Sequence, residues 1–555
     1  MLFFNPNGSG KITRMISISL NNITLILGAR QIFSGLNFEI QHDQKIGLIG
    51  PNGAGKSSLF KLIMGEFNPE KGGIITRARG VSVGYLSQEP QLDPDQTGFA
   101  AALAGNERIA VVKAELESVE TSLGEESVYG NEKKLSRALE RQQQLLDEFQ
   151  SLGGDQYPER VRGLLRGLGL LAGEEDKPMR VLSGGQKKLI GLARLLLSKP
   201  DVLLLDEPDN HLDLAGKEYL ENFIQNYPGA VVIISHDRYL LDSVVTHIAD
   251  LEDGKLETFE GDYSSFIIDK QTRMARQNEL FNVQQHQISR IETAIKRYAL
   301  WAKTYDSEKF AKRAKAIQNR LDHMERIEKP LMERRRMELK LSGWRGSQKV
   351  LEYKKVSKAF DQRQVLREVN FVLHHGERVG LIGPNGTGKS VLLRLALGAM
   401  QPDAGDVILG PSISAGYYAQ EHETLNPEQS VLDTVRLAGN MSESNAVSLL
   451  GRYLFSYKQT SQKIKELSGG ERSRLQLALV VLSKANFLLL DEPTNNLDIA
   501  SAEVLEDALS DFEGTALIIS HDRYFLDQVV DRILTLEDGN LHSHPGGYSD
   551  WLQTR

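Results

Sequence analysis

The stretch KIGLIGPNGAGKSSLFKL, residues 45–62, decides the fold. Lys45–Ile49 predicts a short buried strand, and Ser58–Leu62 starts a helical pattern. The loop between them, Gly50–Ser57, carries glycines that allow backbone N–H groups to surround phosphate oxygens. The helix N-terminus that follows adds a dipole that favours an anion. A fortuitous glycine-rich turn is the alternative, and the strand–loop–helix setting argues against it.

This phosphate-loop pattern predicts a nucleotide site. Lys56 would neutralise the β- and γ-phosphate oxygens, and Ser57 would hold Mg²⁺. A second buried run, Val202–Leu205, ends in two carboxylates. Asp206 can bind the hydration shell of the magnesium ion, and Glu207 can polarise an attacking water. The predicted ATP-binding residues of this loop are Gly50, Pro51, Asn52, Gly53, Ala54, Gly55, Lys56 and Ser57.

The same order of motifs occurs twice. The second loop consists of Gly383, Pro384, Asn385, Gly386, Thr387, Gly388, Lys389 and Ser390, which we also predict to bind ATP. Towards the C-terminal end of each copy, equivalent residues lie 285 positions apart, as in the pairs Ser183/Ser468, Asp206/Asp491 and His236/His521. This spacing indicates an internal duplication of a unit of roughly 200 residues.

With these motifs in place, the chain resembles the ATP-binding cassette (ABC) ATPases. The resemblance implies that Glu207 and Glu492 are catalytic carboxylates and that His236 and His521 are switch histidines. It assigns Mg²⁺ to Ser57, Gln88, Asp206, Ser390, Gln420 and Asp491. The signature segments that contact ATP are Ser183, Gly184, Gly185 and Gln186 in the first copy and Ser468, Gly469, Gly470 and Glu471 in the second. The D-loops fall on Asn210–Asp213 and Asn495–Asp498.

In this family ATP is sandwiched between the phosphate loop of one cassette and the signature of the other. The resemblance therefore pairs Lys56 with Ser468 and Lys389 with Ser183, within a single chain that acts as a monomer. Two competent ATPase sites are expected, because neither copy lacks its catalytic carboxylate.

Two positions depart from the family pattern. Leu27 stands where an aromatic residue stacks on adenine, whereas Phe360 fills that position in the second copy. Asp209 stands where related sequences have threonine, and its effect stays open.

The first copy contains an insertion. Its segment from Gln88 to Ser183 is 47 residues longer than the equivalent segment from Gln420 to Ser468. Apolar residues within it follow two heptad seams, which predict a helical hairpin, or arm, at about 105–153. The seams are Ile109, Val112, Leu116, Val119 and Leu123, then Leu135, Leu139, Gln142, Leu146 and Phe149. An ornament on a tolerant loop is an equal alternative.

Residues 263–345 connect the two copies and are unusually basic. Residues 290–336 hold 14 Lys/Arg and 7 Asp/Glu, a net charge of +7 in a chain of −8. Two heptad seams separated near Thr304–Ser307 predict an antiparallel helical hairpin. They are Ile288, Ile291, Ile295 and Tyr298, then Phe310, Ala314, Ile317, Leu321 and Met324.

The tip of this linker mixes cations with aromatic residues. Lys309, Lys312 and Arg313 share one helix face, and Tyr298, Trp301, Tyr305 and Phe310 lie among the cations. This mixture suits contacts with phosphates and bases, so we predict that these three cations contact RNA. A solvated spacer coiled coil is the alternative.

The expected architecture is α/β: two ABC-type P-loop NTPase domains in tandem, joined by an α-helical hairpin linker, with a helical arm in the first. The expected boundaries are a disordered leader at 1–14, domain 1 at 15–262, the linker at 263–345 and domain 2 at 349–555. Two cassettes in one chain, the insertion, the basic linker and a Ser-His-Asp-Arg-Tyr segment after each last core strand resemble the ABC-F family. The resemblance implies a ribosome-bound translation factor with ATP and Mg²⁺ as cofactors, whose linker reaches rRNA and tRNA. Some family members protect ribosomes from antibiotics.

Bulk composition sets further limits. The chain has no cysteine, which excludes disulfides and thiolate metal sites and is compatible with the cytoplasm. No apolar run approaches the roughly 18 residues of a membrane helix. The rival function is the energy module of a membrane transporter with a separate membrane subunit, and the basic linker argues against it. A scaffold without catalysis is disfavoured by Glu207 and Glu492.

Overall fold

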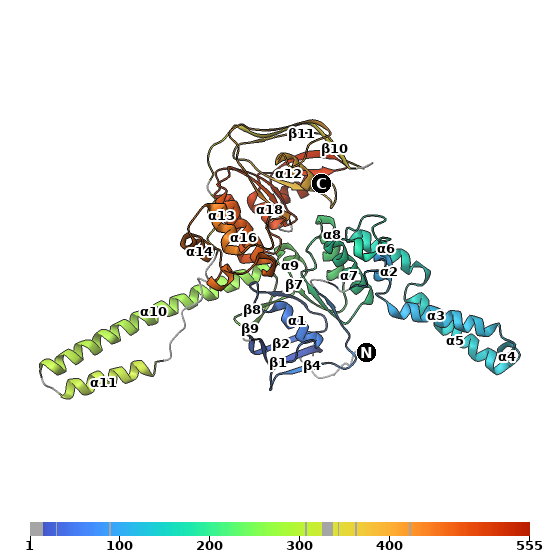
Figure 1. Ribbon diagram of the computed structural model, residues 1–555. Helices are drawn as coiled ribbons and strands as arrows, with labels where there is room; N and C mark the ends of the chain where they lie inside the picture. Colours follow the sequence, from blue (N-terminus) through green and yellow to red (C-terminus); the bar gives the residue numbers. More distant parts are fainter. Residues whose placement is uncertain are drawn as a thin grey trace. The chain divides into compact units, whose positions relative to one another are not determined.

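A computed structural model describes residues 15–28, 30–87, 90, 92–305, 308–324, 337–341, 343–360, 363–420 and 423–554 (Figure 1). The chain forms two compact units. One unit combines Met1–Asp262 with Met337–Arg555 and contains both cassettes, and the other is Tyr263–Arg336. The predicted leader at 1–14 and Gln88 lie outside the described residues.

The first cassette is built on a six-stranded sheet in the order β5-β6-β7-β3-β8-β9. Its strands are β3 (Lys45–Ile49), β5 (Val83–Leu86), β6 (Val202–Asp206), β7 (Ala230–Ile234), β8 (His247–Glu252) and β9 (Lys255–Glu260). All neighbours pair in parallel except β9, which runs antiparallel to β8. The strands β3, β6 and β7 are buried along their whole length, as expected for a parallel sheet that is covered on both faces.

Helices and a smaller sheet complete the first cassette. The antiparallel sheet β2-β1-β4 consists of β1 (Ile16–Leu27), β2 (Arg30–Gln41) and β4 (Ile74–Arg77). The helices are α1 (Lys56–Met64), α2 (Gly98–Leu103), α6 (Tyr157–Gly167), α7 (Gly184–Ser198), α8 (Leu214–Gln225) and α9 (Arg238–Val244). Helix α1 follows β3 directly through the phosphate loop, so the loop lies at the carboxyl edge of the parallel strands, where ligands bind in such sheets.

The second cassette repeats this plan. Its six-stranded sheet has the order β14-β15-β16-β12-β17-β18 and its small sheet the order β11-β10-β13. The strands are β10 (Lys349–Phe360), β11 (Arg363–His374), β12 (Arg378–Ile382), β13 (Ala404–Leu409), β14 (Ala415–Tyr418), β15 (Phe487–Asp491), β16 (Thr515–Ile519), β17 (Arg532–Glu537) and β18 (Asn540–Pro545). The helices are α12 (Lys389–Ala396), α13 (Val431–Gly439), α14 (Glu443–Arg452), α15 (Tyr457–Thr460), α16 (Gly469–Leu482), α17 (Ile499–Ser510), α18 (Arg523–Val529) and α19 (Tyr548–Thr554).

The insertion in the first cassette is helical, as predicted. It contains α3 (Glu107–Leu123), the short α4 (Glu126–Tyr129) and α5 (Glu132–Ser151), and α3 lies beside α5 (Figure 1). The seam predicted for α5 holds in part, because Leu146 and Phe149 pack against the core that α3 and α5 share. Leu139 is 49% exposed, whereas Leu145 is fully buried against Val112 and Leu116.

The linker unit is a pair of helices, α10 (Tyr263–Thr304) and α11 (Glu308–Asp322), which lie side by side (Figure 1). The predicted fold class, including the helical hairpin and the inserted arm, is confirmed. Helix α10 ends at the predicted break, while residues 306–307 and 325–336 lie outside the described residues. None of the helices in the described ranges combines the length and apolar character needed to cross a membrane.

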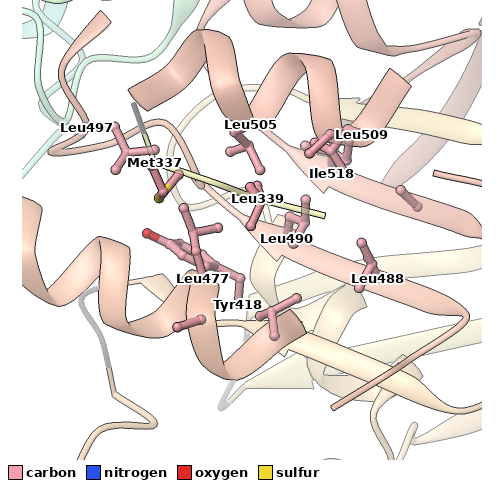
Figure 2. Packing of buried hydrophobic residues seen from close by; sticks show 14 of the residues in the cluster. Met337, Leu339, Tyr418, Leu477, Leu488, Leu490, Leu497, Leu505, Leu509 and Ile518 are labelled. Carbon is pink, nitrogen blue, oxygen red and sulfur yellow. The ribbon is translucent and has the colours of Figure 1, made fainter. Parts of the chain in front are cut away.

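The chain segment that follows the linker enters the core of the second cassette. Met337 and Leu339 are 3% and 8% exposed and belong to the same buried cluster as Leu488, Leu490 and Ile518 (Figure 2). Leu488 and Leu490 belong to β15, the strand that ends in Asp491. The segment that follows the linker therefore packs against β15, the strand that ends in the predicted Mg²⁺ ligand Asp491.

Candidate functional site

The two phosphate loops adopt the same conformation. In the first, Gly50, Gly53 and Gly55 have φ values of 142°, 78° and 104°, which favour glycine. A β-carbon at Gly50 would also collide with the carbonyl oxygen of Leu251. The ammonium of Lys56 lies inside the loop, where its Nζ donates to the carbonyls of Gly50 at 2.7 Å and of Pro51.

Lys389 makes the equivalent contacts, with Nζ donating to the carbonyls of Gly383 at 2.7 Å and Pro384 at 3.0 Å. Burial lowers the pKa of both lysines, and nearby carboxylates oppose that shift. The lysines are thus held by backbone carbonyls at the position where phosphate oxygens would compete for them. Such a cradle of lysine and backbone amides suits a nucleotide triphosphate.

A hydroxyl and a carboxylate meet at the end of each loop. The Ser57 hydroxyl favours the ionised form of Asp206, and the Ser390 hydroxyl favours that of Asp491, because each lowers the pKa of its aspartate. Burial raises the pKa of both aspartates. Oδ2 of Asp206 is buried and finds no hydrogen-bond partner among the described residues. Oxygen ligands with an unpaired lone pair at the edge of a phosphate site fit Mg²⁺, which prefers few protein ligands beside phosphates.

The predicted catalytic glutamates follow these aspartates and share a strained backbone. Glu207 and Glu492 have φ values of 49° and 51°, in the left-handed region that non-glycine residues rarely adopt. The N–H of each glutamate donates a hydrogen bond to the last carbonyl of the neighbouring strand. The acceptors are Ile234 for Glu207 and Ile519 for Glu492. Such strain at a strand end is typical of functional sites.

Burial tunes both carboxyl groups. Burial raises the pKa of Glu207, and it raises the pKa of Glu492 to about 7 even though the Lys389 charge opposes it. A carboxylate with a pKa near neutrality is well matched to proton transfer at physiological pH.

The two predicted switch histidines lie beside the glutamates. The distance from Nε2 to the nearest glutamate oxygen is 3.9 Å for His236 and 3.5 Å for His521. Burial, reinforced by Lys56, lowers the pKa of His236 to about 3, and burial lowers the pKa of His521 well below its usual value. Both imidazoles are therefore neutral, so neither contact is an ion pair. They can accept or donate a single hydrogen bond near the reacting oxygen.

The signature segments open α7 and α16 through reciprocal caps. The Ser183 hydroxyl accepts from the Gln186 N–H, and the Gln186 side chain accepts from the Ser183 N–H. Ser468 and Glu471 form the same box at α16. The capping box fixes each serine at a helix N-terminus, where backbone N–H groups and the dipole favour an anion.

Each phosphate loop contacts the D-loop of the other cassette. The N–H of Asn52 donates to Asp498 at 3.2 Å, and that of Asn385 donates to Asp213 at 3.0 Å. The Asn52 side chain also lies so close to Gly470 that a β-carbon there would approach its amide nitrogen to 2.7 Å. Signature and opposite phosphate loop are thus in van der Waals contact at this interface.

A cavity of about 540 Å³ lies between the second phosphate loop and the first signature. Among the residues that line it are Gly386, Gly388, Lys389, Ser390, Gln420, Asp491, Glu492 and His521 from one cassette and Ser183, Gly185, Gln186 and His236 from the other. The pairing of Lys389 with Ser183 that was expected from the family is therefore present in this geometry. We refer to this cavity with its lining as the second site, and to the region of Lys56, Glu207 and Ser468 as the first site.

The adenine positions differ as the sequence indicated. Phe360, 43% exposed, lines the second site, and the ammonium of Lys358 lies 5.8 Å from its ring centre. Leu27 ends β1 and is 37% exposed. At this pair of positions in the described chain, the second site thus offers an aromatic face to a base and the first offers an aliphatic side chain.

Sequence reasoning missed a buried charged group at the second site. Lys217 on α8 is 7% exposed; its Nζ donates to Asp237 at 2.8 Å and to the carbonyl of His521, in the other cassette, at 2.8 Å. Asp209 lies nearby and also lines the second site. The duplication contained a signal, because the offset of 285 places Ala502 opposite Lys217 and Thr494 opposite Asp209.

Two further ion pairs join the cassettes. Arg238 binds Glu506 through two hydrogen bonds, at 2.8 Å and 3.3 Å, and its duplicate Arg523 binds Glu221. Both arginines stack on a tyrosine of the opposite cassette, Tyr524 and Tyr239 respectively. These pairs hold the two cassettes in register around the sites.

The linker tip is an aromatic cluster surrounded by cations. Phe310 contacts the rings of Tyr298, Trp301 and Tyr305 at centroid distances of 6.3, 5.7 and 6.5 Å. Arg313 lies 5.5 Å from the Tyr298 ring, and Lys312 pairs with Glu308 at 3.1 Å. The aromatic rings that the sequence suggested for base contact thus pack largely on one another, although Tyr305 remains 68% exposed.

Comparison with known proteins supports the same family. A family model described as "ABC transporter" matches residues 33–210 and 366–495, and a second with the same description matches residues 249–341. ABC transporter F family member 5 from Arabidopsis thaliana is 33% identical over 99% of this chain and 80% of its own length. The energy-dependent translational throttle protein EttA from Haemophilus influenzae is 34% identical, over 94% of this chain and 92% of its own.

A solved structure, the complex of archaeal ribosomal stalk protein aP1 with archaeal ribosome recycling factor aABCE1, shares the fold. Its TM-score is 0.60 at 18% identity, and the match covers 96% of this chain and 92% of that chain. The tandem cassettes, the duplicated site residues and the near full-length relatives agree. The chain belongs to the ABC-F family of ATP-binding cassette ATPases.

Proposed function

We propose that this ATPase binds the ribosome in its ATP-bound, closed state through the linker and thereby modulates translation. The observation that carries the proposal is the linker: residues 290–336 have a net charge of +7 in a chain of −8, and the described part of the linker forms the paired helices α10 and α11. A cationic helical surface fits a polyanion such as ribosomal RNA. The 34% identity to a protein named as a translational throttle supports the same partner class.

ATP would act by favouring the closed arrangement of the cassettes. Ser183 and Gly185 approach the γ-phosphate held by Lys389 only when the cassettes meet, and the first site would use Ser468 and Lys56 in the same way. A ligand that contacts both cassettes in only one state shifts the population towards that state. Hydrolysis removes those contacts, so release from the ribosome would follow ATP turnover.

Each residue set has a defined part in this cycle. Ser57 with Asp206, and Ser390 with Asp491 and Gln420, would hold Mg²⁺, which neutralises phosphate charge when bound. Glu207 and Glu492 would orient and deprotonate the attacking water, with the neutral His236 and His521 placed beside them. Their raised pKa values make the ionised carboxylates stronger proton acceptors than an exposed glutamate.

Lys309, Lys312 and Arg313 at the linker tip would contact RNA phosphates. Lys312 would exchange its exposed partner Glu308 for a phosphate, since exposed pairs of this kind contribute little to stability. The aromatic cluster around Phe310 would hold these cations in a fixed arrangement and leave Tyr305 as the ring accessible to a base.

The test replaces these three cations with alanine in a background trapped with ATP by Glu207→Gln and Glu492→Gln. Ribosome affinity is measured by co-sedimentation across a salt series. Each lost phosphate contact reduces the log–log salt slope by about 0.7 to 0.9, so we expect a slope flatter by about 2 to 3. Ribosome-free ATPase activity, measured in the parent background, should stay unchanged because the catalytic groups lie in the cassettes.

The matched control replaces Lys71, Arg79 and Lys255, three exposed cations of the first cassette, with alanine. It removes the same charge and should leave the slope near that of the parent. Equal slopes for the tip variant and the parent would mean that the linker tip is a solvated spacer. Association of the protein with membranes instead of ribosomes would favour the transporter module.

A further inference from the structure

The buried cation Lys217 marks a difference between two otherwise duplicated interfaces. Lys217 lies on α8 of the first cassette, and the carbonyl that it contacts belongs to His521 of the second. At the duplicated position on α17, Ala502 has no group that could reach the carbonyl of His236. We call the backbone around each switch histidine the switch segment. A side chain at position 217 can therefore donate to the switch segment of the other cassette, whereas one at position 502 cannot.

The charge of Lys217 is maintained by its surroundings. Burial alone lowers the pKa of this amine, but Asp237 and Asp209 outweigh that effect and raise it. Asp237 accepts from Nζ at 2.8 Å, while Arg523 approaches the same carboxylate to 3.8 Å. The carboxylate of Asp522 also faces the amine. Lys217 is thus a protonated donor in a closed group of buried charges.

A short chain of contacts runs from this amine to the predicted catalytic base. The carbonyl of His521 accepts from Lys217, while the N–H of the same residue donates to Glu492 at 3.2 Å. The imidazole of His521 also lies 3.5 Å from Glu492. Because His521 is held at its carbonyl and at its N–H, its main chain is fixed with respect to Glu492.

We propose that Lys217 is a positioning residue that acts from the first cassette on the second ATPase site. Its hydrogen bond to His521 holds the switch segment in the arrangement that orients Glu492 for hydrolysis. The contact exists only when the cassettes are together, so hydrolysis at the second site is linked to closure through a group that the first site lacks. This inference rests on the assignment of Glu492 and His521 to the second site, and it is independent of ribosome binding.

The test converts the first cassette to the pattern of the second with Asp209→Thr and Lys217→Ala. Thr494 and Ala502 already occupy the equivalent positions of the folded second cassette. The double change also removes the negative charge of Asp209 together with the positive charge of Lys217. ATP turnover without ribosomes is measured with the second site alone active, in Glu207→Gln, and with the first site alone active, in Glu492→Gln. The single glutamate variants also verify, by themselves, that each site has been assigned correctly.

We expect kcat of the second site to fall about tenfold, the loss expected when a buried hydrogen bond to a charged group disappears. KM for ATP should stay within about twofold, because Lys217 touches no phosphate-loop residue. The fold-decrease in kcat at the first site should be smaller than that at the second by a factor of at least about five. An equal loss at both sites would show a general structural role and overturn the proposal, as would a rise in KM with kcat unchanged.

Lys188→Ser provides a matched control. Lys188 is also a buried cation of the first cassette, and the offset of 285 places a small residue, Ser473, at the equivalent position of the second. Its Nζ donates to the carbonyl of Glu207 at 2.6 Å. Its loss should affect the first site more than the second, which is the opposite preference. If Lys188→Ser lowers kcat of the second site as strongly as the Lys217 variant does, loss of any buried cation suffices, and the proposal fails.

Discussion

The two candidate ATP sites have the same residues in the phosphate loop and at the strand end that follows it. They differ in residues that approach the sites from other parts of the fold. Both have a lysine inside the phosphate loop, a serine–aspartate pair and a glutamate in left-handed backbone conformation. They differ in the residue offered to adenine and in the charged groups beside the switch segment. Duplication thus preserved the phosphate loops, their carboxylates and the paired arginines, whereas Leu27 and Phe360 differ, and so do Lys217 and Ala502.

The largest expected effect tests whether both sites are catalytic. The double variant Glu207→Gln, Glu492→Gln keeps the volume and polarity of each side chain but removes the base. ATP turnover should fall by about 10²- to 10⁴-fold, the contribution typical of a positioned base, while ATP still binds. The two single variants, measured by steady-state hydrolysis, divide the parent rate between the sites. Turnover near that of the parent in the double variant would show that the base lies elsewhere.

The second prediction concerns the paired arginines at the interface. Arg238→Ala and Arg523→Ala each leave a carboxylate without its partner, and breaking a buried ion pair typically costs about 3–5 kcal/mol. Arg523→Ala should cost more, because this guanidinium also lies 3.8 Å from Asp237. The measurement is the free energy of unfolding from urea titration.

Arg108→Ala is the control for these arginines. Arg108 pairs with Glu148 on the surface of the arm, so its loss should leave the urea midpoint unchanged. If the interface arginines behave like Arg108, the two cassettes are not joined by these pairs in solution.

The smallest expected effect concerns the base. Phe360→Ala should weaken ATP binding by about 1 kcal/mol, within the range of a stacked aromatic pair, and Leu27→Ala by less. The reverse change, Leu27→Phe, should strengthen binding at the first site by about 0.5 kcal/mol. Nucleotide titrations in variants with a single intact phosphate loop give the affinity of each site. Equal losses from Phe360→Ala and Leu27→Ala would remove the difference in base recognition between the sites.

The sequence was most informative where chemistry restricts the residue type. The glycines of both phosphate loops, the buried strands before Asp206 and Asp491 and the interval of 285 predicted the tandem fold correctly. These signals are local, because strand, loop and helix follow one another directly in the chain. The placement of Lys389 and Ser183 around one cavity was expected from family resemblance instead, since the two residues are distant in sequence.

Two features were beyond sequence reasoning for physical reasons. In α5 both Leu139 and Leu145 are apolar, and the sequence does not show that Leu145 is buried against α3 while Leu139 is exposed. Lys217 lies in no motif, and a lysine on a helix is usually exposed. Its burial follows from Asp209, Asp237 and a carbonyl in the other cassette, three partners that come together only in the folded protein.

The anchoring of Met337 and Leu339 has a mechanical consequence. Tension on the chain before Met337 would act on these two side chains, because both pack in the core beside β15. A force applied at the linker would thus be transmitted to Leu488 and Leu490, which belong to the same strand as Asp491.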